Sequence, residues 1–227
     1  MDEPLVRVAG LRFDWGSTPC LDIAAFELAA GEQVFLHGPS GSGKSTLLNV
    51  LAGVLVPQAG EVRILGQPLE RLSGAARDRF RGDHVGLVFQ QFNLIPYLSV
   101  LDNVMLPCRF SARRRERTTD PRQAAARLLT HLDLDASLWS RPAVALSVGQ
   151  QQRVAAARAL IGAPEIVIAD EPTSALDAGR QAGFLDLLTR ECAQTRAALV
   201  FVSHDQRLAG RFTRTLALAE INRACAT

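Results

Sequence analysis

The first stretch of the sequence with the residue types for chemistry is the run GPSGSGKST. It follows the apolar segment Val34–Leu36 and precedes an apolar run, 47–51, that favours a helix. Glycines let backbone N–H groups approach phosphate oxygens, and a helix N-terminus adds positive potential. Because this spacing between a strand and a helix is that of the phosphate-binding P-loop, we predict a nucleotide phosphate site here. Its residues are Gly38, Pro39, Ser40, Gly41, Ser42, Gly43, Lys44, Ser45 and Thr46.

Two residues of this run have separate predicted roles. Lys44 reaches the β- and γ-phosphates, and the Ser45 hydroxyl is a ligand for Mg²⁺. Lys44 is the only lysine among the 25 basic residues of the chain. A planar guanidinium does not freely replace a compact ammonium in a phosphate clamp. The position of the chain's only lysine in this run therefore supports the prediction. The alternative is a glycine-rich turn that contains a lysine by chance, and the strand and helix on either side argue against it.

Two adjacent carboxylates, Asp170 and Glu171, end the apolar run that begins at Ile166. Side chains alternate across a strand, so we expect the two to point in different directions and to have different tasks. Asp170 is predicted to hold Mg²⁺, directly or through water, and Glu171 to orient and polarise an attacking water. The alternative is a pair of solvent-facing acids at a strand end.

Two further polar residues follow apolar strand patterns. Gln90 ends the run that begins at Val85, and the carboxyl end of a strand in an open parallel sheet is where ligands bind. His204 follows the apolar segment 198–202, where a neutral imidazole can hydrogen-bond a γ-phosphate. Taken alone, a surface glutamine and a structural histidine are the simpler interpretations.

Ser147 and Gln150 have the spacing of a capping box, which predicts the start of a helix over 151–160. With Gly149 in its first turn, this helix start is a second candidate anion site, and an ordinary helix cap is the alternative. Near the N-terminus, Trp15 is a candidate to stack on adenine. Phe13, two residues earlier on the same strand face, competes for that role, and a semi-buried tryptophan without function is the alternative.

Length and composition limit the class of protein. A chain of 227 residues suits one domain with an inserted subdomain, and its net charge of +2 argues against nucleic-acid binding by bulk electrostatics. Four scattered cysteines without metal-type spacing indicate reduced thiols. We expect a soluble chain, because there is no signal-peptide pattern and the longest apolar runs, such as 197–202, are far shorter than a membrane span.

The remaining elements can be placed coarsely. Segments 5–13 and 25–28, with a turn at 16–19, predict an antiparallel flank before the P-loop strand. Helical patterns interrupted by prolines predict a helical insertion over 91–145. Within it, the basic run 113–117 is most simply a solvated face, and contact with anionic headgroups or with a membrane partner is the alternative. Further predictions are a strand at 61–65 with a turn at 66–68, a strand at 85–89, a helix at 178–191 and a strand at 198–202.

Together these residues resemble the ATP-binding subunit of ABC transporters along essentially the whole chain. GPSGSGKST is similar to the Walker A motif, Gln90 to the Q-loop glutamine, and LSVGQ at 146–150 to the signature motif. IVIADE, ending at Glu171, is similar to Walker B, SALD at 174–177 to the D-loop, and His204 to the switch histidine. Six motifs in this order and spacing are, taken together, specific for this family.

The resemblance implies an α/β P-loop NTPase of the ABC ATPase fold, with a mostly parallel core sheet, an antiparallel β flank and a helical subdomain. The chain is then one domain, 1–227, in which 1–90 and 146–227 form the nucleotide-binding core. The helical subdomain, 91–145, contacts a membrane partner. Trp15 matches the adenine-stacking aromatic, and Asp177 of the D-loop joins the nucleotide-binding residues.

The resemblance also implies a mechanism. Two copies form a head-to-tail homodimer around two ATP molecules with Mg²⁺. Each nucleotide contacts Lys44, Ser45 and Gln90 of one chain, and Ser147, Gly149 and Gln150 of the other. Gln90 is also a ligand of Mg²⁺, and with Glu171 and His204 it serves hydrolysis.

The implied partners are integral membrane permease subunits, which place the chain at the cytoplasmic face of the inner membrane. Residues 85–107 resemble the branch that contains lipoprotein-releasing, macrolide-exporting and cell-division systems. The signature departs from LSGGQ at Val148, where a valine is strained if a positive φ is needed.

Two rival functions remain at this point. One is a soluble ABC-type ATPase acting on nucleic acid or ribosomes, which the near-balanced charge and the single cassette disfavour. The other is a P-loop kinase, another phosphotransferase or a nucleotide-binding regulator, which the signature motif and the Asp-Glu pair disfavour. No nucleic-acid partner is expected.

Overall fold

The N-terminal apolar segments pair as an antiparallel sheet in the computed structural model, which describes residues 3–174 and 178–225. Strand β1 (Val6–Trp15) lies between β2 (Thr18–Leu28) and β4 (Ala59–Ile64), and β4 also pairs with the short β5 (Gln67–Pro68). Buried and exposed side chains alternate along β1, so one face of the sheet packs inward. The predicted antiparallel flank is confirmed.

Two turns are shorter than predicted. Thr18 and Pro19 already belong to β2, so the first turn comprises only Gly16 and Ser17. Gln67 and Pro68 form β5 instead of a turn, because they pair with Ile64 and Arg63 of β4.

The second sheet is parallel, with the order β6-β7-β8-β3-β9. Its strands are β6 (Val85–Val88), β7 (Ile166–Asp170), β8 (Ala198–Val202), β3 (Gln33–His37) and β9 (Arg214–Ala217). The three central strands are buried along nearly their whole length, as expected for strands covered on both faces. The sequence did not indicate β9, which is partly exposed at the edge of the sheet.

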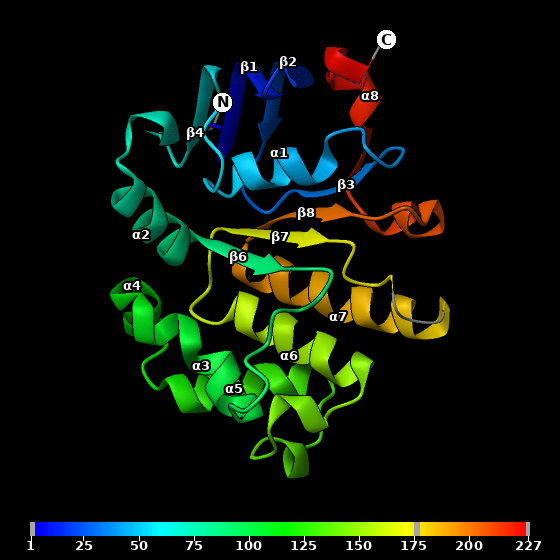
Figure 1. The fold of residues 1–227 in the computed structure, drawn as a ribbon. Helices are drawn as coiled ribbons and strands as arrows, with labels where there is room; N and C mark the ends of the chain where they lie inside the picture. The colour runs from blue at the N-terminus through cyan, green and yellow to red at the C-terminus, as the bar shows by residue number, and fades with distance from the viewer. Residues whose placement is uncertain (1–2, 175–177, 226–227) are drawn as a thin grey trace.

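Two hydrophobic clusters lie on opposite faces of the parallel sheet. Helix α1 (Lys44–Leu51) fills the space between the two sheets, as Figure 1 shows. On the other face, α6 (Val148–Leu160) and α7 (Ala178–Thr195) cover the parallel sheet. The P-loop helix is thus enclosed by strands, while the helix that begins at the signature motif packs on the opposite face.

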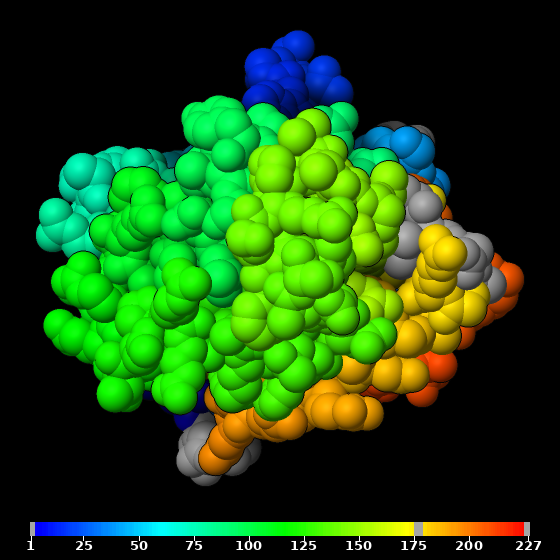
Figure 2. All heavy atoms as spheres, turned by 90° about the horizontal axis from the view of Figure 1, so that it is seen from below, coloured from blue at the N-terminus to red at the C-terminus, as the bar shows by residue number. Residues whose placement is uncertain are grey.

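Helices also occupy the stretch in which the sequence predicts an insertion. They are α3 (Val100–Phe110), α4 (Ala112–Glu116) and α5 (Pro121–His131), followed by short 3₁₀ turns at Ala136–Leu138 and Ala143–Ala145. Seen from below in Figure 2, this green region covers much of the face opposite the antiparallel sheet. Its helices begin at side-chain caps: Ser99, Ser111 and Asp120 each accept hydrogen bonds from backbone N–H groups.

The remaining helical elements are short or were not anticipated. Helix α2 (Gly74–His84) precedes β6, and α8 (Leu218–Ile221) follows β9. Further 3₁₀ turns lie at Leu69–Arg71, Gln206–Arg211 and Arg223–Cys225. Across the described parts of the chain, no helix combines the length and the apolar character needed to cross a membrane.

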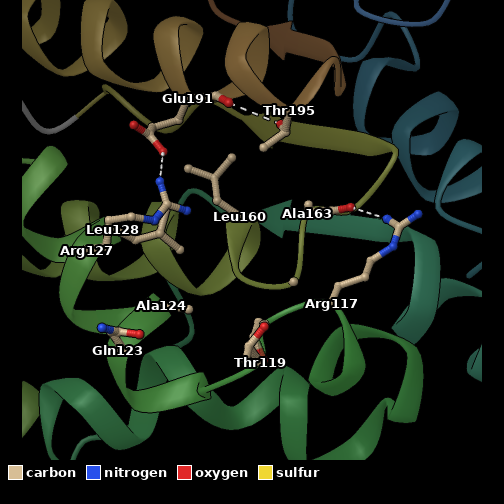
Figure 3. Close-up of a pocket in the computed structure, with 12 residues that line it drawn as sticks. Arg117, Thr119, Gln123, Ala124, Arg127, Leu128, Leu160, Ala163, Glu191 and Thr195 are labelled. Carbon is tan, nitrogen blue, oxygen red and sulfur yellow. Dashed lines mark hydrogen bonds and ion pairs between the residues drawn. The ribbon is translucent and has the colours of Figure 1, made fainter.

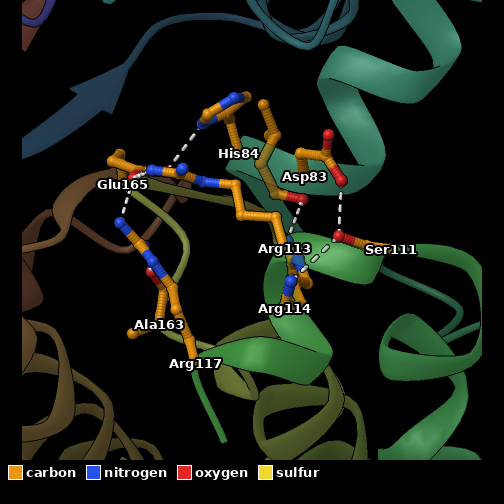
Figure 4. A network of polar contacts seen from close by, with 9 residues as sticks. Asp83, His84, Ser111, Arg113, Arg114, Arg117, Ala163 and Glu165 are labelled. Atoms are coloured by element: carbon orange, nitrogen blue, oxygen red, sulfur yellow. Dashed lines mark hydrogen bonds and ion pairs between the residues drawn. The ribbon is translucent and has the colours of Figure 1, made fainter.

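The basic run 113–117 is not simply a solvated face, which corrects the prediction. Arg113 and Arg117 contact the carboxylate of Glu165 at 2.5 and 2.8 Å, and His84 contacts its other oxygen at 2.9 Å (Figure 4). Burial alone raises the pKa of Glu165, but these contacts outweigh it and lower that pKa to about 2. The Arg114 side chain is buried, with 2% exposure, and donates to backbone carbonyls. The run therefore ties α4 to α2 and to the end of α6.

Strand β6 and helix α6 approach each other closely at Gly86, which gives the first testable prediction. A Cβ on Gly86 would lie 2.3 Å from the carbonyl oxygen of Ala159. Because backbone blocks that space, Gly86→Ala should lower the free energy of unfolding by about 1–3 kcal/mol in urea titrations. Gly82→Ala is the matched control: a Cβ there meets nothing within 4 Å, and alanine favours helix α2. Equal stability of the two variants would contradict the close approach.

Candidate functional site

The residues predicted to do chemistry follow the carboxyl ends of four neighbouring parallel strands. Val202 of β8 is level with Leu36 of β3 on one side and with Asp170 of β7 on the other. Val88 of β6 is level with Ala169 of β7. The register therefore brings the P-loop, both carboxylates, Gln90 and His204 to one edge of the sheet, where ligands bind in open α/β sheets.

The P-loop reverses the chain between β3 and α1. Gly43, the N-cap of α1, has a φ of 97° and makes no side-chain cap. A Cβ there would lie 2.9 Å from Cδ2 of Leu21 and 3.0 Å from the Cys20 carbonyl oxygen, so glycine is required for both space and conformation. The first N–H groups of α1 are thereby left to face the loop, where an anion can accept them.

Lys44 is held within the loop. Its side chain is buried, and Nζ donates to the carbonyl oxygens of Gly38 and Pro39 at 2.8 Å each. The ammonium therefore lies beside the loop with its position fixed by backbone. A phosphate placed on the loop would meet this positive charge.

Asp170 and Glu171 both line the same cavity, although the strand alternation from which their different directions were predicted stops at Asp170. The strand ends at Asp170, and Glu171 has a φ of 48°, so the alternation of a strand does not extend to it. Its N–H donates to the carbonyl oxygen of Val202 at 3.0 Å, which fixes this turn. The two carboxylates are thus neighbours in space as well as in sequence.

The electrostatics of the two carboxylates are similar. Burial raises the pKa of Asp170, while a hydrogen bond from Ser45 and the charge of Lys44 partly oppose that rise. Burial also raises the pKa of Glu171, and the nearby His204 and Lys44 act in the opposite direction. Two acids are therefore kept close together at a desolvation cost, next to the positive charge of the P-loop.

His204 and Gln90 complete this edge. Nε2 of His204 lies 2.8 Å from Oε1 of Glu171, and the imidazole is about half exposed. Gln90 follows β6 and is exposed to the cavity side. The structure therefore places a histidine against the carboxylate predicted to activate water, and an amide on the cavity that the P-loop lines.

One cavity of about 620 Å³ brings most of the predicted residues together. The predicted residues that line it are Trp15, Ser40, Gly41, Gly43, Lys44, Ser45, Thr46, Gln90, Asp170, Glu171 and His204. Pro39 and Ser42 line an adjoining hollow beside Trp15. Gly38 is the acceptor for Lys44 described above. Asp177 lies outside the described residues.

Trp15, not Phe13, presents its ring to this cavity. The Trp15 side chain is 55% exposed, whereas Phe13 is buried beneath it in an edge-to-face contact with ring centroids 5.0 Å apart. Nε1 of Trp15 donates to Oγ1 of Thr46 at 3.4 Å, which joins the indole to the P-loop helix. An aromatic face is thus held open at the edge of the phosphate site.

Sequence reasoning missed Asn222, which supports the P-loop from the C-terminal part of the chain. This buried side chain donates to the carbonyl oxygens of Cys20 and Ser42 and accepts from the N–H of Asp22. It therefore joins β2 to the P-loop. A single asparagine in a short tail carries no local pattern, so nothing in the sequence marked it.

Ser147, Gly149 and Gln150 lie elsewhere, around a separate cavity of about 330 Å³ that no P-loop residue lines. The predicted capping box is confirmed: Ser147 accepts from the N–H of Gln150, and the Gln150 side chain accepts from the N–H of Ser147. Val148 is the first residue of α6 and is not among the residues with positive φ, so the expected strain does not arise.

A third cavity, of about 490 Å³, contains none of the predicted site residues. It lies between α5 and the end of α7, and Figure 3 shows Arg117 and Arg127 on its walls. Arg117 donates to the carbonyl oxygen of Ala163, and Arg127 faces the buried carboxylate of Glu191 at 3.7 Å. This cavity therefore shares no residue with the predicted nucleotide site.

Comparison with known proteins agrees with this geometry. The profile of the family described as ABC transporter matches residues 21–174. An ABC transporter ATP-binding protein of Escherichia coli, YbbA, is 47% identical over 190 residues, which cover 83% of this chain and 81% of that protein. The lipoprotein-releasing system ATP-binding protein LolD 2 of Rhodospirillum rubrum is 40% identical over 224 residues, covering 97% and 96%.

Among solved structures, the ATP-binding cassette MJ0796, a dimer in a post-hydrolysis state bound to ADP and Pi, superimposes with a TM-score of 0.82. It is 35% identical, and the match covers 93% of each chain. The fold is therefore that of an ABC ATPase cassette, as the sequence predicted. The extent of these matches shows that the chain belongs to the ABC transporter family, as an ATP-binding subunit.

Proposed function

We propose that this subunit binds ATP with Mg²⁺, closes as a head-to-tail homodimer, and hydrolyses ATP to drive a separate membrane permease. The observation that carries the proposal is the single cavity in which the P-loop, Asp170, Glu171, Gln90 and His204 meet. A phosphate cradle, a pair of carboxylates and a histidine within one cavity are the parts that phosphoryl transfer to water needs.

The chain's own residues fit a magnesium ion held between protein and phosphates. The Ser45 hydroxyl donates to Asp170, and Gln90 lines the same cavity, so these three residues would hold the ion. Within the described ranges, no group of three or more His, Cys, Asp or Glu side chains is arranged around a metal position. This suits Mg²⁺, which is usually held by one or two carboxylates together with phosphate oxygens and waters. When bound, the ion neutralises charge that develops on the phosphates.

The roles of Glu171 and His204 follow from their contact. Glu171 accepts the proton of an attacking water or orients it, and its raised pKa makes the carboxylate a better proton acceptor. His204 lies against Oε1 of Glu171, so it fixes the direction of that carboxylate and can hydrogen-bond a γ-phosphate. Trp15 supports adenine, since its exposed ring is already oriented by Phe13 and Thr46.

The separation of the two candidate anion sites supports a dimer. Ser147 and Gly149 line a different cavity from Lys44, so one chain does not bring them to the same phosphate. In a head-to-tail pair, the start of α6 in one copy faces the P-loop of the other. ATP then binds both surfaces and favours the closed state, which is the differential affinity that a switch requires.

A groove between α2, β6 and α3 is the proposed contact for the permease, at the cytoplasmic face of the membrane. It measures about 400 Å³ and is lined by Phe89, Leu106 and Phe110, of which Phe110 is 84% exposed. Exposed aromatic side chains that share one groove, as Phe89 and Phe110 do, are typical of an interaction surface. The groove adjoins Gln90, so a segment seated in it senses the nucleotide site. The resemblance to LolD favours lipoprotein release as the work performed, with export or mechanotransmission as the other roles that residues 85–107 suggest.

Asp170→Asn separates stability from function. A pKa raised in the folded protein means that ionised Asp170 destabilises the fold once the pH exceeds the ordinary carboxyl pKa. At neutral pH and without nucleotide, Asp170→Asn should therefore raise the thermal midpoint by a few degrees, while Mg²⁺-dependent hydrolysis is lost. Below the ordinary pKa the two midpoints should converge. Scanning calorimetry between pH 3.5 and 7.5, roughly spanning the titration of a carboxyl group, measures the thermal midpoints of the wild-type chain and of the variant.

Asp205→Asn is the control of opposite sign. Its hydrogen bonds with Arg207 lower the pKa of Asp205, so ionisation stabilises the fold, and the variant should have a lower midpoint at neutral pH. If Asp170→Asn also lowers the midpoint at neutral pH, the burial cost assigned to Asp170 is wrong.

Glu171→Gln removes the proposed water-activating carboxylate and keeps the volume of the side chain. With saturating ATP and Mg²⁺ this variant should accumulate as a dimer in light scattering, because ATP still binds and is not hydrolysed. Lys44→Ala in the same background should remain a monomer, because the phosphate clamp is gone. Glu27→Gln, at an exposed position of β2, controls for the loss of a carboxylate. A monomeric Glu171→Gln chain under these conditions contradicts the two-chain site.

The permease contact is tested by recovering the tagged Glu171→Gln chain from mildly solubilised native membranes with ATP and Mg²⁺. A stoichiometric multi-spanning protein should accompany it. Phe110→Asp should abolish that recovery without preventing ATP-dependent dimerisation, since Phe110 lines the groove and not the nucleotide cavity. Recovery with ribosomal proteins or nucleic acid would instead support a soluble ABC ATPase.

A further inference from the structure

Helix α6 is joined to the loop after Gln90 by the side chain of Arg158. Its Nη2 donates to the carbonyl oxygen of Phe92 at 2.5 Å, and its Nη1 donates to that of Asn93 at 2.7 Å. The same helix is capped at its N-terminus by Ser147, the residue proposed to meet the nucleotide of the partner copy. One guanidinium therefore connects the signature helix to the segment that carries Gln90.

The loop is shaped to present these carbonyls. Phe92 and Asn93 both have positive φ, 55° and 48°, which is uncommon for residues other than glycine. The N–H of Phe92 donates to the Phe89 carbonyl at 3.0 Å, and that of Asn93 donates to the Gln91 carbonyl at 2.6 Å. The first of these turns contains Gln90 and the second is centred on Phe92, whose buried ring anchors both in the core beside α6. A shift of Gln90 must therefore move the acceptors of Arg158.

The contact depends on the shape of the guanidinium and not only on its charge. Burial lowers the pKa of Arg158, and no carboxylate among the described residues forms an ion pair with it. Two backbone carbonyls satisfy the cation through a planar fork, which a lysine ammonium cannot reproduce. Lysine keeps the charge and loses the two-pronged geometry.

A buried arginine, Arg114, also contacts the C-terminal end of α6. Arg114 donates to the carbonyl oxygens of Ala159 and Ile161 at 3.2 and 3.1 Å, and to that of Val85 at 2.7 Å. Figure 4 shows this side chain among the polar contacts of α4. Arg114 thus ties α6 to the beginning of β6, whereas Arg158 ties α6 to the segment beyond the end of β6.

We propose that Arg158 is a positioning residue for ATP hydrolysis, which transmits the position of Gln90 to the signature helix α6. This inference rests on the function proposed above. Arg158 touches neither the P-loop nor Trp15, so it should not affect the binding of ATP to a single chain. It should affect hydrolysis in the closed dimer, where Gln90 of one copy contacts one nucleotide and the start of α6 of that same copy contacts the other.

The test compares Arg158→Lys with the wild-type chain in steady-state hydrolysis and in titration with a fluorescent ATP analogue. Turnover should fall about tenfold, whereas the dissociation constant for the analogue should change less than about twofold, because binding and closure are separate steps. Thermal midpoints, measured in parallel, establish that the variant is folded. Unchanged turnover in a folded Arg158→Lys chain would overturn the inference, as would a loss confined to ATP affinity.

A double variant tests whether Arg158 acts through Gln90. If it does, adding Arg158→Lys to Gln90→Ala should reduce turnover little further, because residues that act as one unit are non-additive. Arg114→Lys is the matched control: it also removes a guanidinium that bridges backbone carbonyls, but it should combine additively with Gln90→Ala. Additive behaviour of Arg158→Lys would overturn the inference. A wild-type chain that binds ATP without hydrolysing it would instead overturn the proposed function.

Discussion

The register of the parallel sheet is the constraint on which the nucleotide site depends. Val202 is level with Leu36 and with Asp170, so three chain segments distant in sequence finish at the same height. A slip of one residue would move every following group by about 3.3 Å and turn strand side chains to the other face. The apolar faces that fix this register are buried between α1 on one side and α6 and α7 on the other. Hydrophobic packing therefore determines where the charged groups meet.

The features that could be predicted from the sequence are those that depend on residues close together in the chain. The P-loop glycines, the capping box at Ser147 and the apolar strands 166–170 and 198–202 each depend on neighbours in sequence, and the structure contains all of them. Resemblance to a known family then supplied the fold, because six motifs in order leave few alternatives.

What could not be predicted depends on contacts between distant segments. Arg114 looks like one more residue of a solvated basic run, and only the carbonyls of Val85, Ala159 and Ile161 explain its burial. Asn222 has a function only because Cys20 and Ser42 lie beside it. The alternation rule does not apply to Glu171 because the strand ends one residue earlier, at a boundary that the sequence did not mark. Short edge strands such as β9 have too little buried surface to leave a pattern.

The environment of Lys44 has a consequence for chemical probing of this protein. The chain has no other lysine, and the ammonium of Lys44 is enclosed by the carbonyls of Gly38 and Pro39. Apart from the α-amino group, an acylating reagent therefore finds one amine, and it lies at the centre of the phosphate loop. The extent of lysine acylation, read by mass spectrometry, becomes a measure of how open the P-loop is, with no background from other lysines.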